Sequence, residues 1–169
     1  TLNMFAGSLG SGLLQGGDAV ISGGSLGSSF AINTQESTLT LQGGDFQLDG
    51  TPITSPPQIF GGSQSAAHAF TGLLADGSVF VLLNQGTFLP SSSVTLEQTA
   101  VPPSENPGVL TAGTFTKGLR PGELLTVSDA GTLTDSFAVH NATLNVDGGT
   151  VGERLTLAGS TANISGGQI

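Results

Sequence analysis

Residues 132 to 169 contain an 18-residue repeat that ends in a Gly-Gly pair, and this repeat limits the possible folds more than any other feature. The first copy, 132–149, reads TLTDSFAVHNATLNVDGG, and the second, 150–167, reads TVGERLTLAGSTANISGG. Apolar residues recur at matching positions, in the pairs Leu133 and Val151, Phe137 and Leu155, Val139 and Leu157, Leu144 and Ala162, and Val146 and Ile164. A unit this small cannot bury its own apolar side chains, so successive copies must stack on one another.

Within each copy, apolar and polar residues alternate in the way that a strand with one buried face requires. Asn145 lies between Leu144 and Val146, and Asn163 occupies the same place in the second copy. This period of two is the signature of a half-buried strand. The closing Gly-Gly pairs supply the positive φ that a sharp corner needs. Each copy is therefore predicted to form one coil of a β-solenoid with about 18 residues per coil.

The same pattern occurs near the N-terminus, in residues 8–24 and 25–44, which also end in Gly-Gly. The matching positions pair Leu9 with Leu26, Leu13 with Phe30, and Ile21 with Leu41. Four copies in one chain predict a solenoid block at each end.

Both ends of the chain fall inside a coil. Residues 1–7 align with 143–149, and Ile169 falls at the position of Val151. We therefore expect a piece of a longer repeat protein. We also expect the end coils to expose unpaired strand edges and an apolar surface at Leu2, Met4 and Ile169, which would promote self-association through end-to-end stacking or continuation of coils.

The middle of the chain does not fit the repeat and reads as antiparallel β-structure. Asp49-Gly50 and Asp76-Gly77 each lie between apolar runs, which is a hairpin signal. The predicted organisation is a first solenoid block at 1–46, an antiparallel hairpin insert at 47–118 and a second solenoid block at 119–169. A left-handed hexapeptide helix would place apolar positions on Asn145 or Asn163, so a right-handed parallel β-helix is favoured.

Composition and charge restrict the partners of the chain. Charged residues make up 9% of the chain, against roughly 25% in a typical soluble domain. The net charge is −9 with three basic residues, Lys117, Arg120 and Arg154, which disfavours binding to nucleic acid or to an anionic membrane surface. No apolar run reaches the length of a membrane-spanning helix, and cysteine is absent, so membrane insertion and disulfides are not expected.

No set of residues with catalytic spacing stands out. His68 and His140 lie far apart, and His140 is expected at an outward position beside a corner. Asp18, Asp45 and Asp147 adjoin Gly-Gly corners, where solvated turn residues are the favoured interpretation and a calcium site is the alternative. We therefore predict that the chain is not an enzyme, has no catalytic or metal-binding residues, and needs no cofactor.

The segments NVDGGTVGERL, NISGG, ISGGSLGSSF and LQGGDFQLDGTPI, followed by TGLLADGSVFVL, carry a resemblance to known proteins. They resemble the Gly-Gly-punctuated β-helix repeats of very large secreted surface proteins of planctomycete-type bacteria, and are broadly similar to autotransporter-passenger solenoids. The resemblance implies an extracellular or cell-surface scaffold, stalk or adhesive surface, and no catalytic residues.

Two further functions stay open beside the structural fibre. The hairpin insert could present an adhesive face to a glycan or a partner protein. A polysaccharide-cleaving enzyme is the third alternative, and it would require a groove with converging carboxylates and a cation.

Overall fold

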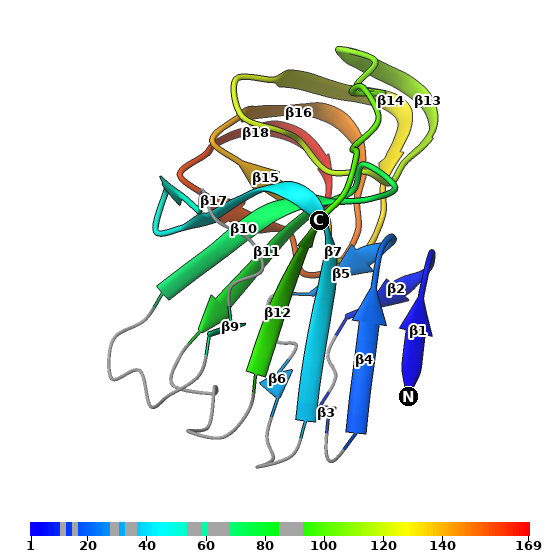
Figure 1. The fold of residues 1–169 in the computed structure, drawn as a ribbon. Helices are drawn as coiled ribbons and strands as arrows, with labels where there is room; N and C mark the ends of the chain where they lie inside the picture. The colour runs from blue at the N-terminus through cyan, green and yellow to red at the C-terminus, as the bar shows by residue number, and fades with distance from the viewer. Residues whose placement is uncertain are drawn as a thin grey trace.

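The computed structural model describes residues 1–10, 13–14, 17–27, 31–32, 37–53, 59–60, 68–84 and 93–169. The described residues contain no helix, and their parallel sheets stack as a β-solenoid of about seven turns with a spacing of about 18 residues (Figure 1). The predicted all-β solenoid is therefore confirmed. Within the described residues, no helix is long and apolar enough to cross a lipid bilayer.

The first block is built on a parallel sheet whose strands follow one another coil by coil. Its strands in spatial order are β1 (Leu2–Met4), β4 (Gly17–Ile21), β7 (Ser37–Leu48) and β12 (Ser93–Gln98). Two short sheets complete the coils, β2 (Ser8–Leu9) with β5 (Ser25–Leu26) and β3 (Leu13–Leu14) with β6 (Ala31–Ile32).

The predicted register of the first block is largely confirmed. Leu9 pairs with Leu26, and Ile21 pairs with Leu41. The predicted match of Leu13 with Phe30 is wrong by one residue, because Leu13 pairs with Ala31. The two copies differ in length at this corner, so the sequence alignment does not determine the pairing there.

The second block contains the most regular coils. Its main sheet has the order β13 (Val109–Phe115), β14 (Leu124–Leu133), β16 (Thr143–Val151) and β18 (Thr161–Gln168), all parallel. A second face is formed by β15 (Ala138–His140) and β17 (Thr156–Ala158). The predicted pairings of this block are confirmed for Leu133 with Val151, Val139 with Leu157, Leu144 with Ala162, and Val146 with Ile164.

Two hairpins occur where the sequence predicts them. Asp49 and Gly50, at φ 50° and 76°, connect β7 to β8 (Thr51–Pro52), and two positive φ angles are what a type I′ turn requires. Asp76-Gly77 lies between β10 (His68–Leu74) and β11 (Val79–Asn84), which pair antiparallel. The short strand β9 (Ile59–Phe60) pairs antiparallel with β12.

The region between residues 47 and 118 also contains two parallel strands, β12 and β13, that continue the solenoid. In β12, Val94 pairs with Leu39 and Leu96 with Leu41, so β12 takes the place of the next coil after β7. The partners Gln42 and Glu97 are 55 residues apart in the chain. Because this separation is much longer than 18 residues, the repeat period is not visible here. From the sequence alone, β12 is therefore assigned to the insert.

The Gly-Gly corners behave as predicted in three of the four pairs that can be compared. The second glycine has a positive φ at Gly24 (92°), Gly149 (71°) and Gly167 (92°). At Gly43-Gly44 neither glycine does, and Asp45 adopts φ 52° instead. At this corner β7 continues without a break, and its second half pairs with β10 of the hairpin.

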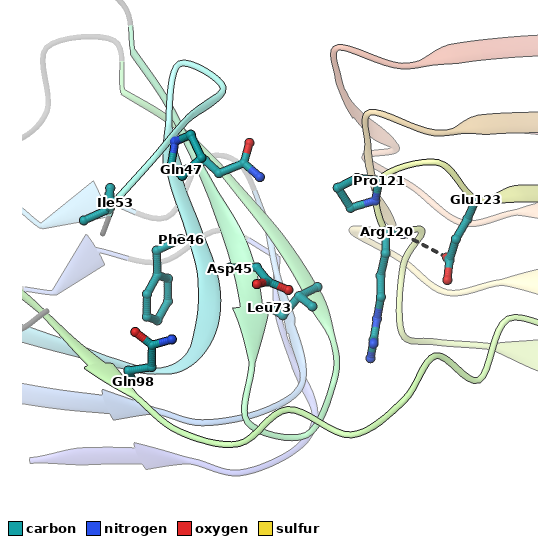
Figure 2. Close-up of a pocket in the computed structure, with 10 residues that line it drawn as sticks. Asp45, Phe46, Gln47, Ile53, Leu73, Gln98, Arg120, Pro121 and Glu123 are labelled. Atoms are coloured by element: carbon teal, nitrogen blue, oxygen red, sulfur yellow. Dashed lines mark hydrogen bonds between the residues drawn. The ribbon is translucent and has the colours of Figure 1, made fainter. Parts of the chain in front are cut away.

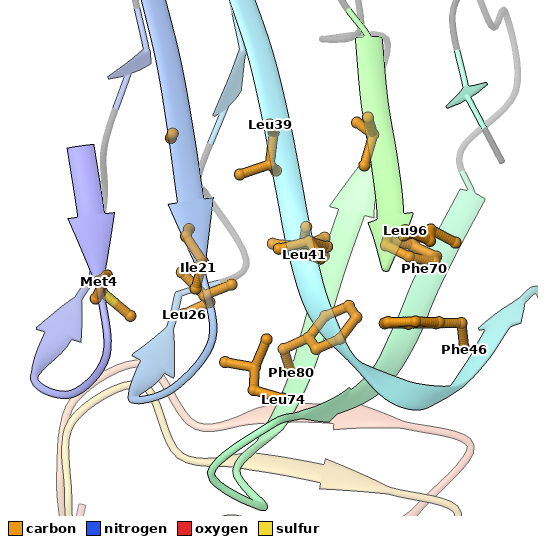
Figure 3. Close-up of a cluster of buried hydrophobic side chains, with 13 residues drawn as sticks. Met4, Ile21, Leu26, Leu39, Leu41, Phe46, Phe70, Leu74, Phe80 and Leu96 are labelled. Carbon is orange, nitrogen blue, oxygen red and sulfur yellow. The ribbon is translucent and has the colours of Figure 1, made fainter. Parts of the chain in front are cut away.

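The hairpin β10–β11 lies between the two solenoid blocks. On β11, Phe80 and Leu82 face the core of the first block. Figure 3 shows Phe80 in this core with Ile21 of β4, Leu41 of β7 and Leu96 of β12. Val79 and Val81 face the other way, toward Ala138 of the second block. Each face of β11 is therefore buried against a different block, and the hairpin joins the two cores.

Candidate functional site

The structure separates the three predicted self-association residues into two groups. Leu2 and Ile169 are exposed, at 40% and 71% of their surface. Met4 is only 7% exposed and belongs to the core of the first block, so the expectation that it lies open at the chain end is wrong. Met4 is buried because its side chain points into the coil, opposite Ile21 of β4.

The coil that contains β17 and β18 leaves apolar side chains open that are buried one coil earlier. Val146 is fully buried, whereas its partner Ile164 is 49% exposed. Val139 is also fully buried, and its partner Leu157 is 41% exposed. In a solenoid each coil covers the one before it. Among the described residues, none covers this coil, and the result is an apolar surface bordered by a strand edge.

Polar side chains are also stacked from coil to coil at this end. The Asn163 side-chain Nδ2 donates a hydrogen bond of 2.9 Å to Asn145 Oδ1. Two residues further along the same strand, Ser165 Oγ donates to Asp147 Oδ1 at 2.7 Å. The two asparagines form a short ladder along the sheet, which begins at Asn145 because the preceding coil has Thr126 at this position.

A groove of about 590 Å³ lies between the two blocks (Figure 2). Its lining residues are Asp45, Phe46, Gln47, Pro52, Ile53, Leu73 and Gln98 on one side, and Arg120, Pro121 and Glu123 on the other. The amides and carboxylates can exchange hydrogen bonds with hydroxyl groups, and the proline, leucine and isoleucine side chains supply apolar wall. These groups are suited to binding a neutral polar molecule.

Arg120 in this groove is engaged in joining parts of the chain. Its Nη1 and Nη2 donate to the carbonyl oxygens of Pro102 and Gly77, at 2.9 and 3.0 Å. Its backbone N–H donates to Glu123 Oε2 at 2.9 Å. The guanidinium group therefore holds the hairpin turn against the second block, and Glu123 orders the corner that carries it.

Asp76 connects both blocks at the turn of the β10–β11 hairpin. Its Oδ2 accepts hydrogen bonds from Gly24 N in the first block and from Lys117 Nζ, at 2.9 and 3.0 Å. Ser78 donates both its N–H and its Oγ–H to the same carboxylate. Burial alone would raise the pKa of Asp76, but the hydrogen bonds from Ser78, Gly24 and Lys117 outweigh it and hold the pKa below its usual value.

His140 is buried, at 4% exposure, so its predicted outward position is wrong. Its Nε2 lies 3.3 Å from Thr71 Oγ1 of β10 and 3.0 Å from Asn141 Nδ2. Burial lowers the pKa of His140. The side chain of His68, the other histidine, lies outside the described residues.

The corner carboxylates do not come together. Asp147 bonds to Ser165, while Asp45 lies in the groove between the blocks. Among the described histidine, aspartate and glutamate side chains, no three gather in an arrangement that could hold a metal ion.

The junction between the blocks was not predicted from the sequence. All three basic residues of the chain lie there: Lys117 at Asp76, Arg120 at Pro102 and Gly77, and Arg154 with its guanidinium against Gly10. Ser25 Oγ adds a bond of 2.8 Å to the Ser136 carbonyl. The scarcity of basic residues in an acidic chain was the available signal in the sequence, because Lys117 bonds to a carboxylate and Arg120 to two backbone carbonyls at this junction.

Comparison of the chain with protein-family models, with curated proteins and with solved structures found no match.

Proposed function

We propose that this chain is a structural segment of an extracellular or cell-surface fibre, and that it acts as a rigid scaffold that is extended by stacking coil on coil. The observation that carries the proposal is the open coil at β17 and β18. Its apolar residues Leu157, Ile164 and Ile169 are exposed although their partners one coil earlier are at most 2% exposed. A surface that repeats the core of the solenoid is suited to receive another coil.

Magnitudes favour a weak, concentration-dependent contact. Full burial of an isoleucine or leucine side chain contributes about 1.5–3 kcal/mol. The free energy gained from burying three such side chains and forming new strand hydrogen bonds has to exceed an association cost of about 4–15 kcal/mol. Because the contact joins two different ends, it would produce open filaments rather than closed pairs.

The proposal is tested by placing a charge in the open coil. We expect Ile164→Asp to abolish assembly of the chain in sedimentation velocity and in negative-stain electron microscopy, because a carboxylate would be buried at the contact. Leu124→Asp is the matched control, since Leu124 is similarly exposed at 52% but lies on β14, two coils before the open one. A wild-type chain that stays monomeric at all concentrations would contradict the proposal.

The groove between the blocks favours a second candidate function, a module that binds a glycan or a partner protein. Gln47 and Gln98 offer amides to sugar hydroxyl groups, beside the apolar wall at Ile53. The described residues of the hairpin from Phe70 to Leu74 and from Ser78 to Leu82 are themselves buried, so the binding face would be the groove and not the hairpin. A glycan array with the wild type and with Gln98→Ala tests this candidate, and binding that Gln98→Ala removes would support it.

A further inference from the structure

We infer that the open coil binds the first strand of a second copy of this chain, with β1 of that copy parallel to β18 and Asn3 stacked on Asn163. The inference rests on the proposed function, since it names the partner of the same open coil. It specifies the partner and the register, which the assembly test above does not.

The sequence of the first strand repeats that of the coils on which it would stack. Residues 1–9 read TLNMFAGSL, residues 143–151 read TLNVDGGTV and residues 161–169 read TANISGGQI. In this register Leu2 lies over Ala162, Met4 over Ile164 and Leu9 over Ile169. The three apolar columns that run through residues 143–151 and 161–169 are thus each continued by an apolar residue.

The backbone agrees with the sequence match. Gly149 and Gly167 turn the corner of their coils with φ 71° and 92°, and Gly7, at the matching position, has φ 97°. The first segment therefore turns at the residue where a further coil of the second block would turn. A strand with this corner follows the path of β18 without rearrangement.

The two strand edges are suitably oriented. Within the described part of the chain, β1 pairs only with β4, and β18 pairs only with β16. Both of these pairings are parallel. The unpaired edge of β1 faces away from β4, on the N-terminal side of the first block, and the unpaired edge of β18 faces away from β16, on the C-terminal side of the second block. Head-to-tail addition therefore continues one direction of winding from copy to copy.

Polar contacts select the same register. Asn163 already donates to Asn145, and Asn3, which is exposed, would add a third amide to this ladder. In a chain with a net charge of −9, neither 1–9 nor 161–169 carries a charged side chain, so the contact brings no like charges together. A shift by one residue would place Leu2 over Asn163 and reverse the inward and outward faces.

The test uses single cysteines in the full chain, which has none of its own. An equimolar mixture of Asn3→Cys and Asn163→Cys is oxidised and analysed on a non-reducing gel. Neighbouring parallel strands lie about 4.8 Å apart, which is within disulfide reach. We expect a mixed dimer to be the main product, at least about tenfold above a mixture with Ser165→Cys, because a displacement of two residues exceeds that reach.

The outcomes separate this inference from the proposed function. Assembly of the wild type with no preference for the 3–163 dimer would overturn the register and leave the fibre proposal intact. Symmetric dimers of Asn163→Cys alone would overturn head-to-tail stacking. Absence of wild-type assembly in sedimentation would overturn both.

Discussion

At the scale of single residues, the chain uses its few charges to join its parts. Asp76 lies 52 residues from Gly24 and 41 from Lys117 in sequence, yet its carboxylate accepts a hydrogen bond from each. Hydrogen bonds to a charged group contribute about 1.5–3 kcal/mol when they are partly shielded from water. A single carboxylate therefore fixes the position of the hairpin turn against both blocks.

We predict that Asp76→Ala lowers the free energy of unfolding by about 2–3 kcal/mol, since it leaves the Gly24 N–H and the Lys117 ammonium without their acceptor. Urea unfolding monitored by circular dichroism measures this loss. Glu105→Ala removes an exposed carboxylate from the loop before β13 and serves as control, with an expected change within about 0.5 kcal/mol. Equal effects of the two substitutions would contradict the role assigned to Asp76.

His140 makes the stability dependent on pH. Because burial lowers its pKa below 6.5, the folded chain binds the proton less readily than the unfolded chain. The contribution is therefore fully present above about pH 6.5 and is lost as the pH falls from there to the lowered pKa. The loss is at most about 1.4 kcal/mol per pH unit for one proton.

We expect His140→Gln to flatten the decline in unfolding free energy between about pH 7 and pH 5. Urea titrations of both proteins at several pH values measure the two slopes. Identical slopes would show that His140 is not the group responsible.

At the scale of elements, the corner at Gly43-Gly44 decides where the solenoid gives way to the hairpin. A Cβ at Gly43 would collide with the carbonyl oxygen of Leu73 on β10. Since that oxygen belongs to the backbone, it cannot move without displacing the strand. Gly43 is therefore required for close contact between strands and not for a positive φ.

We predict that Gly43→Ala lowers the free energy of unfolding by about 1–3 kcal/mol, as expected for a forced backbone shift. Gly44→Ala is the control, because a Cβ there would meet the Val101 Cγ2 at 3.3 Å, where the side chain can adjust, and the Thr99 carbonyl oxygen at 3.7 Å, which is an ordinary van der Waals contact. Urea unfolding of both variants gives the comparison. A larger loss for Gly44→Ala would contradict this account of the corner.

At the scale of the whole molecule, the two blocks share one central layer. The strand β11 contributes Phe80 to the first core and Val81 to the cluster with Ala138 of the second block. Both side chains are fully buried. Loss of either block would expose one face of this strand, so we expect the blocks to unfold together.

We predict a single calorimetric transition for the wild type, with equal calorimetric and van't Hoff enthalpies. Val81→Asp should lower the melting temperature and split the transition, because a buried carboxylate disrupts the contact between the blocks. Leu83 lies on the same strand but is already 40% exposed, so the control variant Leu83→Asp should still unfold in a single transition. Two transitions in the wild type would contradict a shared layer.

The sequence by itself determined the solenoid coils, most of their register and both Asp-Gly hairpins. These features depend on local alternation, on an 18-residue period and on turn residues that act over a few positions. Leu144, Ala162 and their neighbours could therefore be paired from the sequence alone.

Only the tertiary structure decided what each buried face packs against. Alternation shows that Val79 and Val81 share a face, but not that this face meets a second block. The burial of His140 and Met4, the parallel pairing of β12, and the convergence of Lys117 and Asp76 depend on contacts between segments far apart in the chain. An exposed apolar coil was expected from the repeat. That Leu157 and Ile164 are the side chains exposed there follows only from the structure, in which none of the described residues covers the coil of β17 and β18.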